Sequence, residues 1–428
     1  MRILDAVKDP RSVSALVQRR WEVNREVEDR VREILDDVQK EGDEAVTTYT
    51  RQLDCKLIDS LGLTVSERER EAAYGSVSKK FLKALRIAQT NIRQFHKNQV
   101  LKSWSVKDKG MKLQQRMLPL KRVGVYIPGG KASYPSTVLM NALPAVIAGV
   151  SEIVMTTPCS NEGKIAPEVL VAAGECGITE MYRIGGVQAV GAFAFGTESI
   201  RRVDKITGPG NEYVAAAKRM VYGRVGIDVI AGPTEVVVVA DGTAQPKFVA
   251  ADLIAQAEHD EHASPMCITT SPAIAQQIEL AIALQLETAP RRAVAQRAFD
   301  RQGVIIVVGT MKQAADIVNE FAPEHLEVMV KHPDRFAERI ANAGSIFIGD
   351  WSAEALGDYV AGPNHTLPTS GTARFSSPLS VYDFMKFINV IEISRRRFQK
   401  LAPHVEVLAE AEGLYGHAAS IRIRRESQ

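Results

Sequence analysis

The first hundred residues carry apolar positions at helical spacing. One helix is predicted by residues that recur every three or four positions before Gly42: Val23, Val27, Val31, Ile34, Leu35 and Val38. A second helix is predicted to begin at Ser66, because Ser66 and Glu69 have the spacing of a capping box. This part of the chain is therefore predicted to be mostly helical.

The pattern changes to that of β-strands between residues 104 and 120. Asp108, Lys109 and Gly110 form a turn signal between the strand-like residues around Val106 and Leu113. We therefore predict a β-hairpin, and expect it to lead into the next domain.

Apolar strands then alternate with helical segments along residues 122–240. The predicted strands are 123–127, 152–155 and 180–184, and helices are predicted to begin at Ser136, Ala166 and Val187. The alternation returns over residues 249–347, with strands predicted at 266–269, 304–308 and 345–348. It is typical of parallel sheets with crossover helices, so the expected fold class is α/β with two similar domains. Smaller N-terminal and C-terminal helical segments are expected to flank them.

Length and composition indicate a multidomain globular protein. A chain of 428 residues is long enough for roughly three domains or two larger ones with appendages. The formal net charge of +2 gives no strong electrostatic signature, so a nucleic-acid partner is not expected. The N-terminus lacks the layout of a signal peptide, and the apolar stretch 138–150 is short and interrupted by Asn141 and Pro144. We therefore predict a cytoplasmic protein without a membrane segment.

Four cysteines are spread along the chain without a CxxC spacing: Cys55, Cys159, Cys176 and Cys267. This spacing argues against both a disulfide framework and a thiolate metal site. Small core residues are the simplest interpretation. The alternative is a nucleophile, with Cys159 or Cys267 forming a covalent adduct as in a thiol-dependent aldehyde dehydrogenase.

Glycine-rich turns follow three of the predicted strands: Pro128-Gly129-Gly130-Lys131, Gly185-Gly186 and Gly208-Pro209-Gly210-Asn211. Glycine lets backbone amides approach a phosphate closely, and such turns can meet at the sheet edge where α/β folds bind ligands. The alternative is three ordinary tight turns. Because no GxGxxG motif is present, a dinucleotide would bind here without the standard fingerprint.

Gln256 and His259 are three residues apart on a helix predicted to begin near Pro246. Both would then lie on one face and could hold a metal ion, although a histidine that caps the helix is the simpler explanation of this pair taken alone. Asp358 and His417 could supply the remaining oxygen and nitrogen ligands. A set of Gln, His, Asp and His suits zinc and leaves room for substrate atoms.

Glu324 and His325 are adjacent, directly after Pro323. A carboxylate beside an imidazole is suited to proton transfer, and we expect the acid–base chemistry here. On a strand the two side chains would face opposite ways, whereas at a loop both could border one cavity. The alternative is that Glu324 caps or pairs while His325 packs.

Seven segments of the chain resemble the signature of the histidinol dehydrogenase family. They are IDVIAGPTE at 227–235, DLIAQAEH at 252–259, GVYIPGG at 124–130, TGPGN at 207–211, APEHL at 322–326, GDY at 357–359 and NHTLPT at 364–369. The resemblance covers nearly the whole chain. It also implies an architecture similar to that of aldehyde dehydrogenases, with a pair of incomplete Rossmann-like domains.

The resemblance implies a zinc-dependent and NAD-dependent oxidation of L-histidinol to L-histidine through bound L-histidinal, in the last steps of histidine biosynthesis. It further implies a homodimer in which the C-terminal tail crosses to the partner subunit. Residues 122–235 would form the NAD-binding domain. Residues 23–121 with 236–377 would carry the metal and acid–base residues, residues 1–22 an N-terminal segment and residues 378–428 the exchanged tail.

Site residues follow from the resemblance position by position. Glu324 would activate water for hydration of the aldehyde, and His325 would be the general base. The positions that match the family's zinc ligands are Gln256, His259, Asp358 and His417. Those that match its NAD contacts are Tyr126, Gln188 and Asn211. Those that match its substrate contacts are Thr234, Gln256, His259, His325, Asp358, His365, Glu412 and His417.

Three alternatives to histidinol oxidation stay open on the sequence alone. One is a related zinc-dependent dehydrogenase of another small polar alcohol, because metal and base positions would be shared. The second is the thiol-dependent aldehyde dehydrogenase. The third is a non-catalytic metal-binding or nucleotide-binding regulator on an inherited scaffold.

Overall fold

The computed structural model describes residues 1–18, 24–129, 133–230 and 232–427. Val23, Gly130, Lys131 and Ala231, which the sequence patterns include, lie outside the described residues. The chain divides into two compact units. Residues 1–99 with 120–384 form the first unit, and residues 100–119 with 385–428 form the second.

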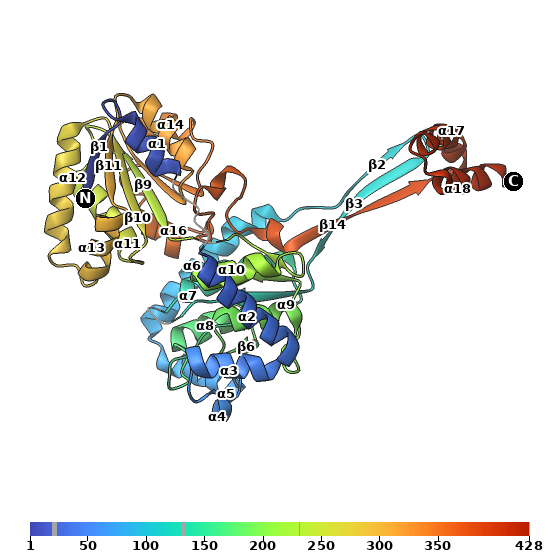
Figure 1. Ribbon diagram of the computed structural model, residues 1–428, viewed down its shortest axis with the longest axis horizontal. Helices are drawn as coiled ribbons and strands as arrows, with labels where there is room; N and C mark the ends of the chain where they lie inside the picture. Colours follow the sequence, from blue (N-terminus) through green and yellow to red (C-terminus); the bar gives the residue numbers. More distant parts are fainter. Residues whose placement is uncertain (19–23, 130–132, 231, 428) are drawn as a thin grey trace. The chain divides into compact units, whose positions relative to one another are not determined.

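The first unit contains a five-stranded parallel sheet with the order β6-β5-β4-β7-β8. Its strands are β4 (Arg122–Tyr126), β5 (Glu152–Thr156), β6 (Glu180–Tyr182), β7 (Lys205–Thr207) and β8 (Gly226–Ile227). The helices between these strands in the described residues are α7 (Pro135–Ala148), α8 (Pro167–Glu175), α9 (Gly186–Phe195) and α10 (Glu212–Val221), all of which are labelled in Figure 1. Every residue of β4 is buried, as expected for a parallel strand covered on both faces. The predicted α/β alternation is confirmed.

The N-terminal helices cover this same sheet. They are α2 (Arg25–Glu41), α3 (Asp43–Leu53), α4 (Ile58–Leu61), α5 (Glu67–Ser76), α6 (Lys79–His96) and the short 3₁₀ turn Lys97–Gln99. Val31 and Val46, from α2 and α3, are fully buried in one apolar cluster with Phe193 of α9. The expected grouping of residues 23–121 with 236–377 is therefore wrong for these helices. Their periodicity shows that one face is buried, but it cannot show which sheet buries it.

The first unit also contains a six-stranded parallel sheet with the order β1-β11-β10-β9-β12-β13. Its strands are β1 (Arg2–Asp5), β9 (Glu235–Ala240), β10 (Ser264–Thr269), β11 (Val304–Val307), β12 (His325–Met329) and β13 (Ser345–Ile348). Strand β1 pairs with β11, so the N-terminal segment 1–22 contributes an edge strand to this domain. Strand β12 was not predicted.

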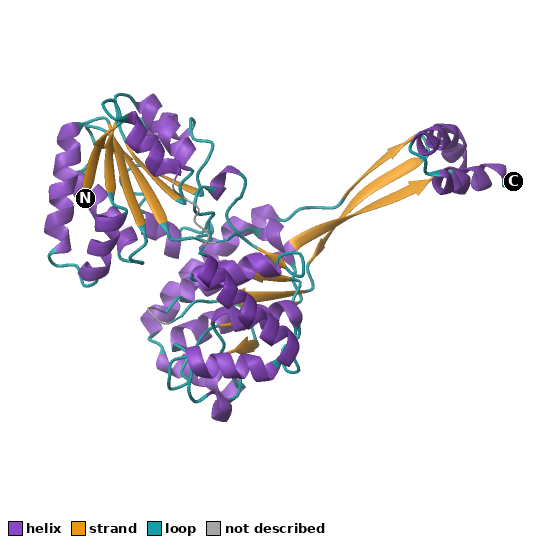
Figure 2. Cartoon of the chain, viewed as in Figure 1, coloured by secondary structure: helices purple, strands orange, loops and turns teal. Residues whose placement is uncertain are grey.

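Helices cover both faces of the six-stranded sheet (Figure 2). One apolar cluster joins it to α11 (Pro246–Ala257), α12 (Pro272–Leu286) and α13 (Arg292–Arg301). The opposite cluster joins it to α1 (Pro10–Gln18), α14 (Met311–Phe321) and α15 (Pro333–Ala337). Helix α16 (Glu354–Tyr359) follows β13, and two 3₁₀ turns follow at Thr372–Arg374 and Val381–Phe384.

The second unit is a three-stranded antiparallel sheet with the order β14-β3-β2 and two helices. Its elements are β2 (Trp104–Asp108), β3 (Met111–Pro119), β14 (Met385–Ile393), α17 (Arg395–Ala411) and α18 (Tyr415–Glu426). The predicted hairpin is confirmed, and its turn residues Lys109 and Gly110 have φ of 45° and 91°. The hairpin pairs with the C-terminal tail, however, rather than forming part of an α/β domain. The tail unit begins at residue 385, not 378, because Leu379, Val381 and Phe384 are buried in the first unit.

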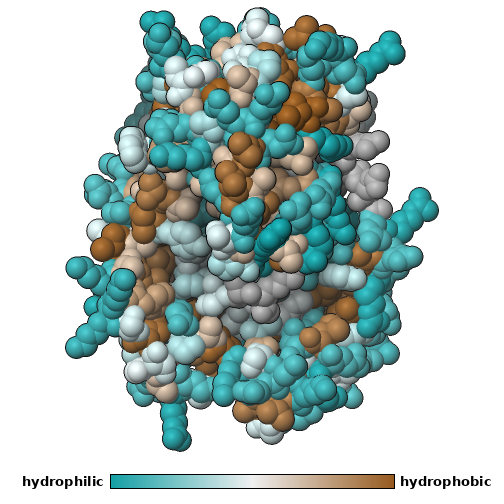
Figure 3. Space-filling model, turned by 90° about the vertical axis from the view of Figure 1, so that its left-hand side faces the viewer, coloured by the Kyte–Doolittle hydropathy of each residue, from teal (hydrophilic) through white to brown (hydrophobic). Residues whose placement is uncertain are grey.

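One face of the protein has a surface of the ordinary mixed kind. Figure 3 shows one face, on which hydrophilic side chains predominate and apolar ones are scattered among them. Within the described ranges, none of the helices combines the length and apolar character needed to span a membrane.

Candidate active site

Two neighbouring strands bring the main site residues together. Strands β9 and β12 are parallel, and their register places His325 opposite Val236. Thr234 and Glu235 lie at the start of β9, and Glu324 and His325 lie next to them at the start of β12. The site therefore lies at the amino ends of these strands.

Glu324 immediately precedes β12, and its carboxylate is held by two hydrogen bonds. Its Oε2 accepts from Thr234 Oγ1 at 2.7 Å and from the Glu235 amide at 2.9 Å. Burial raises the pKa of Glu324 well above its usual range, while these two hydrogen bonds act in the opposite direction. A buried carboxylate of raised pKa is a stronger base once ionised than an exposed one, which suits it to remove a proton from water.

His325 is buried, and several groups surround its ring. Nδ1 lies 3.1 Å from the Glu235 carbonyl oxygen, 3.6 Å from Glu324 Oε2 and 3.5 Å from Glu354 Oε1, and Nε2 lies 3.8 Å from Asp358 Oδ1. A carbonyl oxygen only accepts, so Nδ1 carries the hydrogen of the neutral ring. Nε2 is then unprotonated, and it has no hydrogen-bond partner among the described residues. Burial lowers the pKa of His325, which keeps the ring in the form that accepts a proton.

Gln256 lies on α11 and extends the hydrogen-bond chain that begins at Glu324. Its Nε2 donates to Thr234 Oγ1 at 2.8 Å, and the Thr234 hydroxyl in turn donates to Glu324. The remaining amide atom, Gln256 Oε1, is buried and has no partner within the part of the chain that the structure describes. An amide oxygen left in this way is available to a ligand or a metal ion.

His259 is not on the helix that carries Gln256. Helix α11 ends at Ala257, Glu258 is its C-cap, and His259 lies in the turn that follows, where it is exposed. The expectation that both side chains share one face of a helix is therefore wrong. Burial is the main cause that lowers the pKa of His325, and a smaller contribution from His259 acts in the same direction, so the turn lies near the site.

Asp358 and His365 come from α16 and the loop after it. His365 Nδ1 donates to the Asp358 carbonyl oxygen at 2.8 Å, and His365 Nε2 lies 3.4 Å from Thr137 Oγ1 on α7. This loop thus connects the six-stranded sheet with a helix of the five-stranded one. The ligand atoms of Asp358, His325 and Glu354 lie within 4.8 Å of one another, close enough to surround an ion.

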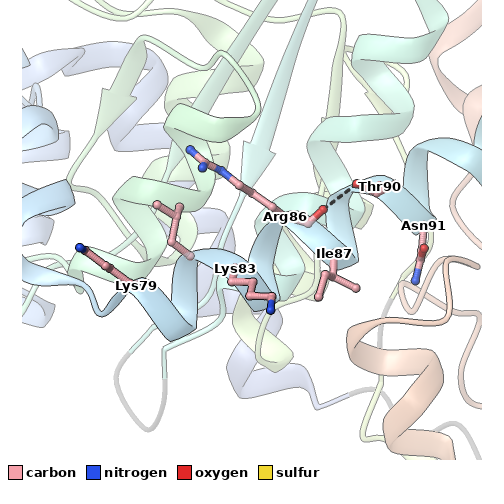
Figure 4. Close-up of a pocket in the computed structure, with 7 residues that line it drawn as sticks. Lys79, Lys83, Arg86, Ile87, Thr90 and Asn91 are labelled. Atoms are coloured by element: carbon pink, nitrogen blue, oxygen red, sulfur yellow. Dashed lines mark hydrogen bonds between the residues drawn. The ribbon is translucent and has the colours of Figure 1, made fainter.

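Of these groups, His325, Asp358 and His365 border a cavity of about 530 Å³, a size that suits a small ligand. Sixteen residues line it: His325, Ser345, Ile346, Phe347, Ile348, Trp351, Ser352, Ala353, Leu356, Gly357, Asp358, Ala361, Pro363, Asn364, His365 and Leu367. A second hollow of about 550 Å³ runs along α6 (Figure 4). The expected site residues are absent from its lining: Lys79, Leu82, Lys83, Arg86, Ile87, Thr90 and Asn91. We therefore place the candidate site in the first cavity.

Sequence reasoning missed Glu354, which begins α16. The carboxyl group is buried beside His325, and burial raises its pKa well above the usual range. The Glu354 amide donates to Glu327 Oε1 at 2.8 Å, so a second buried carboxyl group lies close by. The only signal in the sequence was an acid within the otherwise apolar stretch 353–356.

The residues expected to contact a dinucleotide lie at turns of the five-stranded sheet. The Gly186 amide donates to the Tyr126 hydroxyl oxygen at 3.2 Å, which joins the ends of β6 and β4. Gly208 has φ of 118°, and a Cβ there would lie 1.9 Å from the Tyr126 carbonyl oxygen. Two of the predicted glycine-rich turns thus meet at the carboxyl end of β4, as expected for a ligand edge.

Asn211 and Gln188 have local roles at these turns. Asn211 is the N-cap of α10, and its side chain accepts from the Val214 amide at 3.1 Å. Gln188, fully buried on α9, donates through Nε2 to Asp54 Oδ2 at 3.1 Å. Asp54 is a second residue that sequence reasoning missed.

Glu412 and His417 belong to the second unit. Glu412 is the C-cap of α17, and His417 lies in the first turn of α18. The other expected site residues belong to the first unit.

A family model described as histidinol dehydrogenase matches residues 17–425. The chain belongs to the histidinol dehydrogenase family. A histidinol dehydrogenase of Gluconobacter oxydans is 50% identical over 414 residues, which cover 96% of this chain and 96% of that protein. One from Synechococcus sp. is 49% identical over 398 residues, 93% of this chain and 92% of that protein. A crystal structure of histidinol dehydrogenase from Elizabethkingia anophelis is 37% identical with a TM-score of 0.92, and the match covers 99% of this chain and 98% of that chain.

Proposed function

We propose that this histidinol dehydrogenase family member oxidises L-histidinol to L-histidine through bound L-histidinal, with zinc and two molecules of NAD, in histidine biosynthesis. One observation carries the proposal. A buried neutral imidazole, His325, has its Nε2 free, and a buried carboxylate, Glu324, lies beside it. This pair supplies both the base for the oxidations and the base for the hydration between them.

The residues present fit a zinc ion. Gln256 Oε1 has no partner in the described structure, and Asp358 Oδ1 lies 3.8 Å from His325 Nε2. With His259 and with His417 of a partner subunit, these would give two oxygen and two nitrogen ligands, which zinc accepts. Zinc bound there would hold the amino and imidazole nitrogens of histidinol and thereby fix the carbinol carbon.

In the first oxidation, His325 Nε2 removes the proton of the substrate hydroxyl. NAD, when bound, accepts the hydride from the carbinol carbon. The Nδ1 hydrogen bond to the Glu235 carbonyl stabilises the imidazolium that His325 then becomes. The proton must leave the ring before the second oxidation, because the same atom is needed again.

In the second stage, Glu324 removes a proton from the water that attacks the aldehyde carbon. Thr234 and the Glu235 amide keep the carboxylate in place for this step. As the water adds, the aldehyde oxygen takes the proton held by the His325 imidazolium and becomes a hydroxyl group in the position of the original alcohol. His325, neutral again, removes that proton as the second hydride leaves. One base therefore serves both oxidations, while Glu324 serves only the hydration.

The exposed apolar residues of the second unit favour contact with a partner subunit. Its side chains Phe387, Ile391 and Val407 are 56, 68 and 67% exposed. Surfaces of this kind are typical of subunit interfaces. We therefore include in the proposal a homodimer in which Glu412 and His417 complete the site of the other subunit.

Tail exchange predicts complementation between two inactive variants. His417→Ala leaves the first-unit residues intact, and His325→Asn leaves the tail intact. Mixing them at equal amounts and reannealing subunits should restore about a quarter of wild-type activity, because half of the dimers are hybrids with one complete site. Activity is measured as NADH formation before and after mixing. No recovery in a mixture shown to contain hybrid dimers would contradict the exchange.

The thiol-dependent alternative is disfavoured by the position of the cysteines. Cys267 is fully buried within β10, and burial raises its pKa to about 12. Burial also raises the pKa of Cys159 to about 12. Thiols held neutral in this way are poor nucleophiles.

The proposed function is tested by counting NADH per substrate. Purified protein loaded with zinc should form two NADH for each L-histidinol consumed, lose this activity on chelation and regain it with added zinc. Turnover of another amino alcohol, with none of L-histidinol, would leave the family assignment in place and overturn the proposed substrate.

A further inference from the structure

Asp54 places a carboxylate at the cofactor edge of the five-stranded sheet. It follows α3 directly, and its Oδ2 accepts from the Gly185 amide and from Gln188 Nε2, each at 3.1 Å. Gly185 is the N-cap of α9, and Gln188 lies in the first turn of that helix. The other carboxylate oxygen, Oδ1, accepts no hydrogen bond from the described residues, and Asp54 is only partly buried. One oxygen is therefore used to build the turn, and the other is open to a ligand.

Gln188 provides a second hydrogen-bond acceptor for a ligand at this edge. Its side chain is fully buried, and its Oε1 has no hydrogen-bond partner among the residues that the structure describes. The Asp54 carboxylate only accepts, so it orients Gln188 with Nε2 toward itself and leaves Oε1 free. Buried amide oxygens are rarely left without a donor, so the missing donor is expected from a bound molecule.

The chemistry of the ligand follows from these two atoms. Asp54 Oδ1 and Gln188 Oε1 are both acceptors, and both belong to one hydrogen-bonded pair. A ligand that satisfies them must bring hydrogen-bond donors. A ribose supplies adjacent hydroxyl groups, and carboxylate recognition of ribose hydroxyls is common in dinucleotide-binding folds.

We propose that Asp54 is a cofactor-binding residue, which orients Gln188 through Oδ2 and accepts a hydrogen bond from a ribose hydroxyl of NAD through Oδ1. The inference rests on the proposed function, since it assumes that NAD binds at this edge. It assigns the N-terminal helices a role in the cofactor site, although they lie outside the strands and turns that form the rest of it.

The protonation state of Asp54 gives this role a pH dependence. Burial raises the pKa of Asp54 to about 6. The titratable groups that face it are the Tyr126 hydroxyl and the Cys159 thiol, and burial raises the pKa of both, so they stay neutral there. As pH falls through about 6, Asp54 gains a proton and becomes a weaker acceptor. Affinity for NAD is therefore expected to fall on the acid side.

The test compares Asp54→Asn with Asp59→Asn. Asn has the shape of Asp but no charge. Asp59 lies nearby on α4, where its exposed carboxylate pairs with Arg51 at 2.6 Å, so its replacement is a matched control. We expect Asp54→Asn to raise the KM for NAD about tenfold to a hundredfold, the usual effect of a hydrogen bond to a charged group, with the KM for L-histidinol unchanged. Titration calorimetry with NAD alone should show the same loss, and the dependence on pH near 6 should disappear.

The outcomes separate this inference from the proposed function. A wild-type protein that does not bind NAD would overturn the function itself. Wild-type binding of NAD that Asp54→Asn retains, with the same pH dependence, would overturn the role of Asp54 alone. A variant with a lowered melting temperature and an equal rise in both KM values would show that Asp54 is structural only, and this too would overturn the inference.

Discussion

Replacing Glu324 with glutamine is expected to slow the oxidation of L-histidinal about a hundredfold or more, while the oxidation of L-histidinol changes little. The amide oxygen of glutamine can still accept from Thr234 and from the Glu235 amide, the two donors that hold the carboxylate. The geometry of the site is thus retained. What is lost is the base that activates water, which only the second oxidation requires.

The measurement supplies each substrate separately and follows NADH formation in a single turnover. With L-histidinol, the variant should release the first NADH at close to the normal rate, and the second should lag. Asp350→Asn, which changes an acidic residue outside the lining of the catalytic cavity, is a suitable control. Equal losses with both substrates would show that Glu324 does not act in hydration alone.

Replacing His325 with asparagine is expected to slow both oxidations by about a hundredfold to ten-thousandfold. The asparagine amide can donate to the Glu235 carbonyl oxygen in place of Nδ1, so the buried hydrogen bond is kept. The position of Nε2, however, is left without a base. The loss should therefore be similar for L-histidinol and L-histidinal.

Single-turnover rates with each substrate, together with thermal unfolding, check this expectation. His332→Asn makes the same change at an exposed position before α15 and should leave both rates unaltered. If the His325 variant oxidised L-histidinal at the normal rate, a second base would have to serve the later step.

The central strands of the parallel sheets could be predicted well because they are buried on both faces. Such strands read as continuous apolar runs, and the predicted strand 123–127 overlaps β4, in which every residue is buried. Strand β12 escaped prediction because it begins with His325 and contains Glu327, so its pattern is not that of an apolar run. Strand β1 is short and pairs with a distant partner, β11.

The candidate site could be predicted from the residue pattern where its residues are neighbours in sequence, whereas His365, which lies far from them along the chain, was assigned by the family resemblance. Glu324 and His325 were found from their adjacency, and the structure places both beside Glu235. Glu354 and Asp54 lie on elements that are distant in sequence from the residues they contact, His325 and Gln188. A single sequence does not show such tertiary contacts. The end of α11 was misjudged for a similar reason, since nothing in the pattern marks the stop after Ala257.

The pairing of β3 with β14 also constrains how the chain folds as it is made. Residues 111–119 of β3 cannot pair with residues 385–393 of β14 until the latter have been synthesised. During synthesis the hairpin therefore has an unpaired strand edge while the first unit is completed. The second unit is thus the last part of the chain to fold on the ribosome. Any nascent or truncated chain that ends before residue 385 exposes that edge, which makes it prone to aggregate and a target for chaperones and proteases.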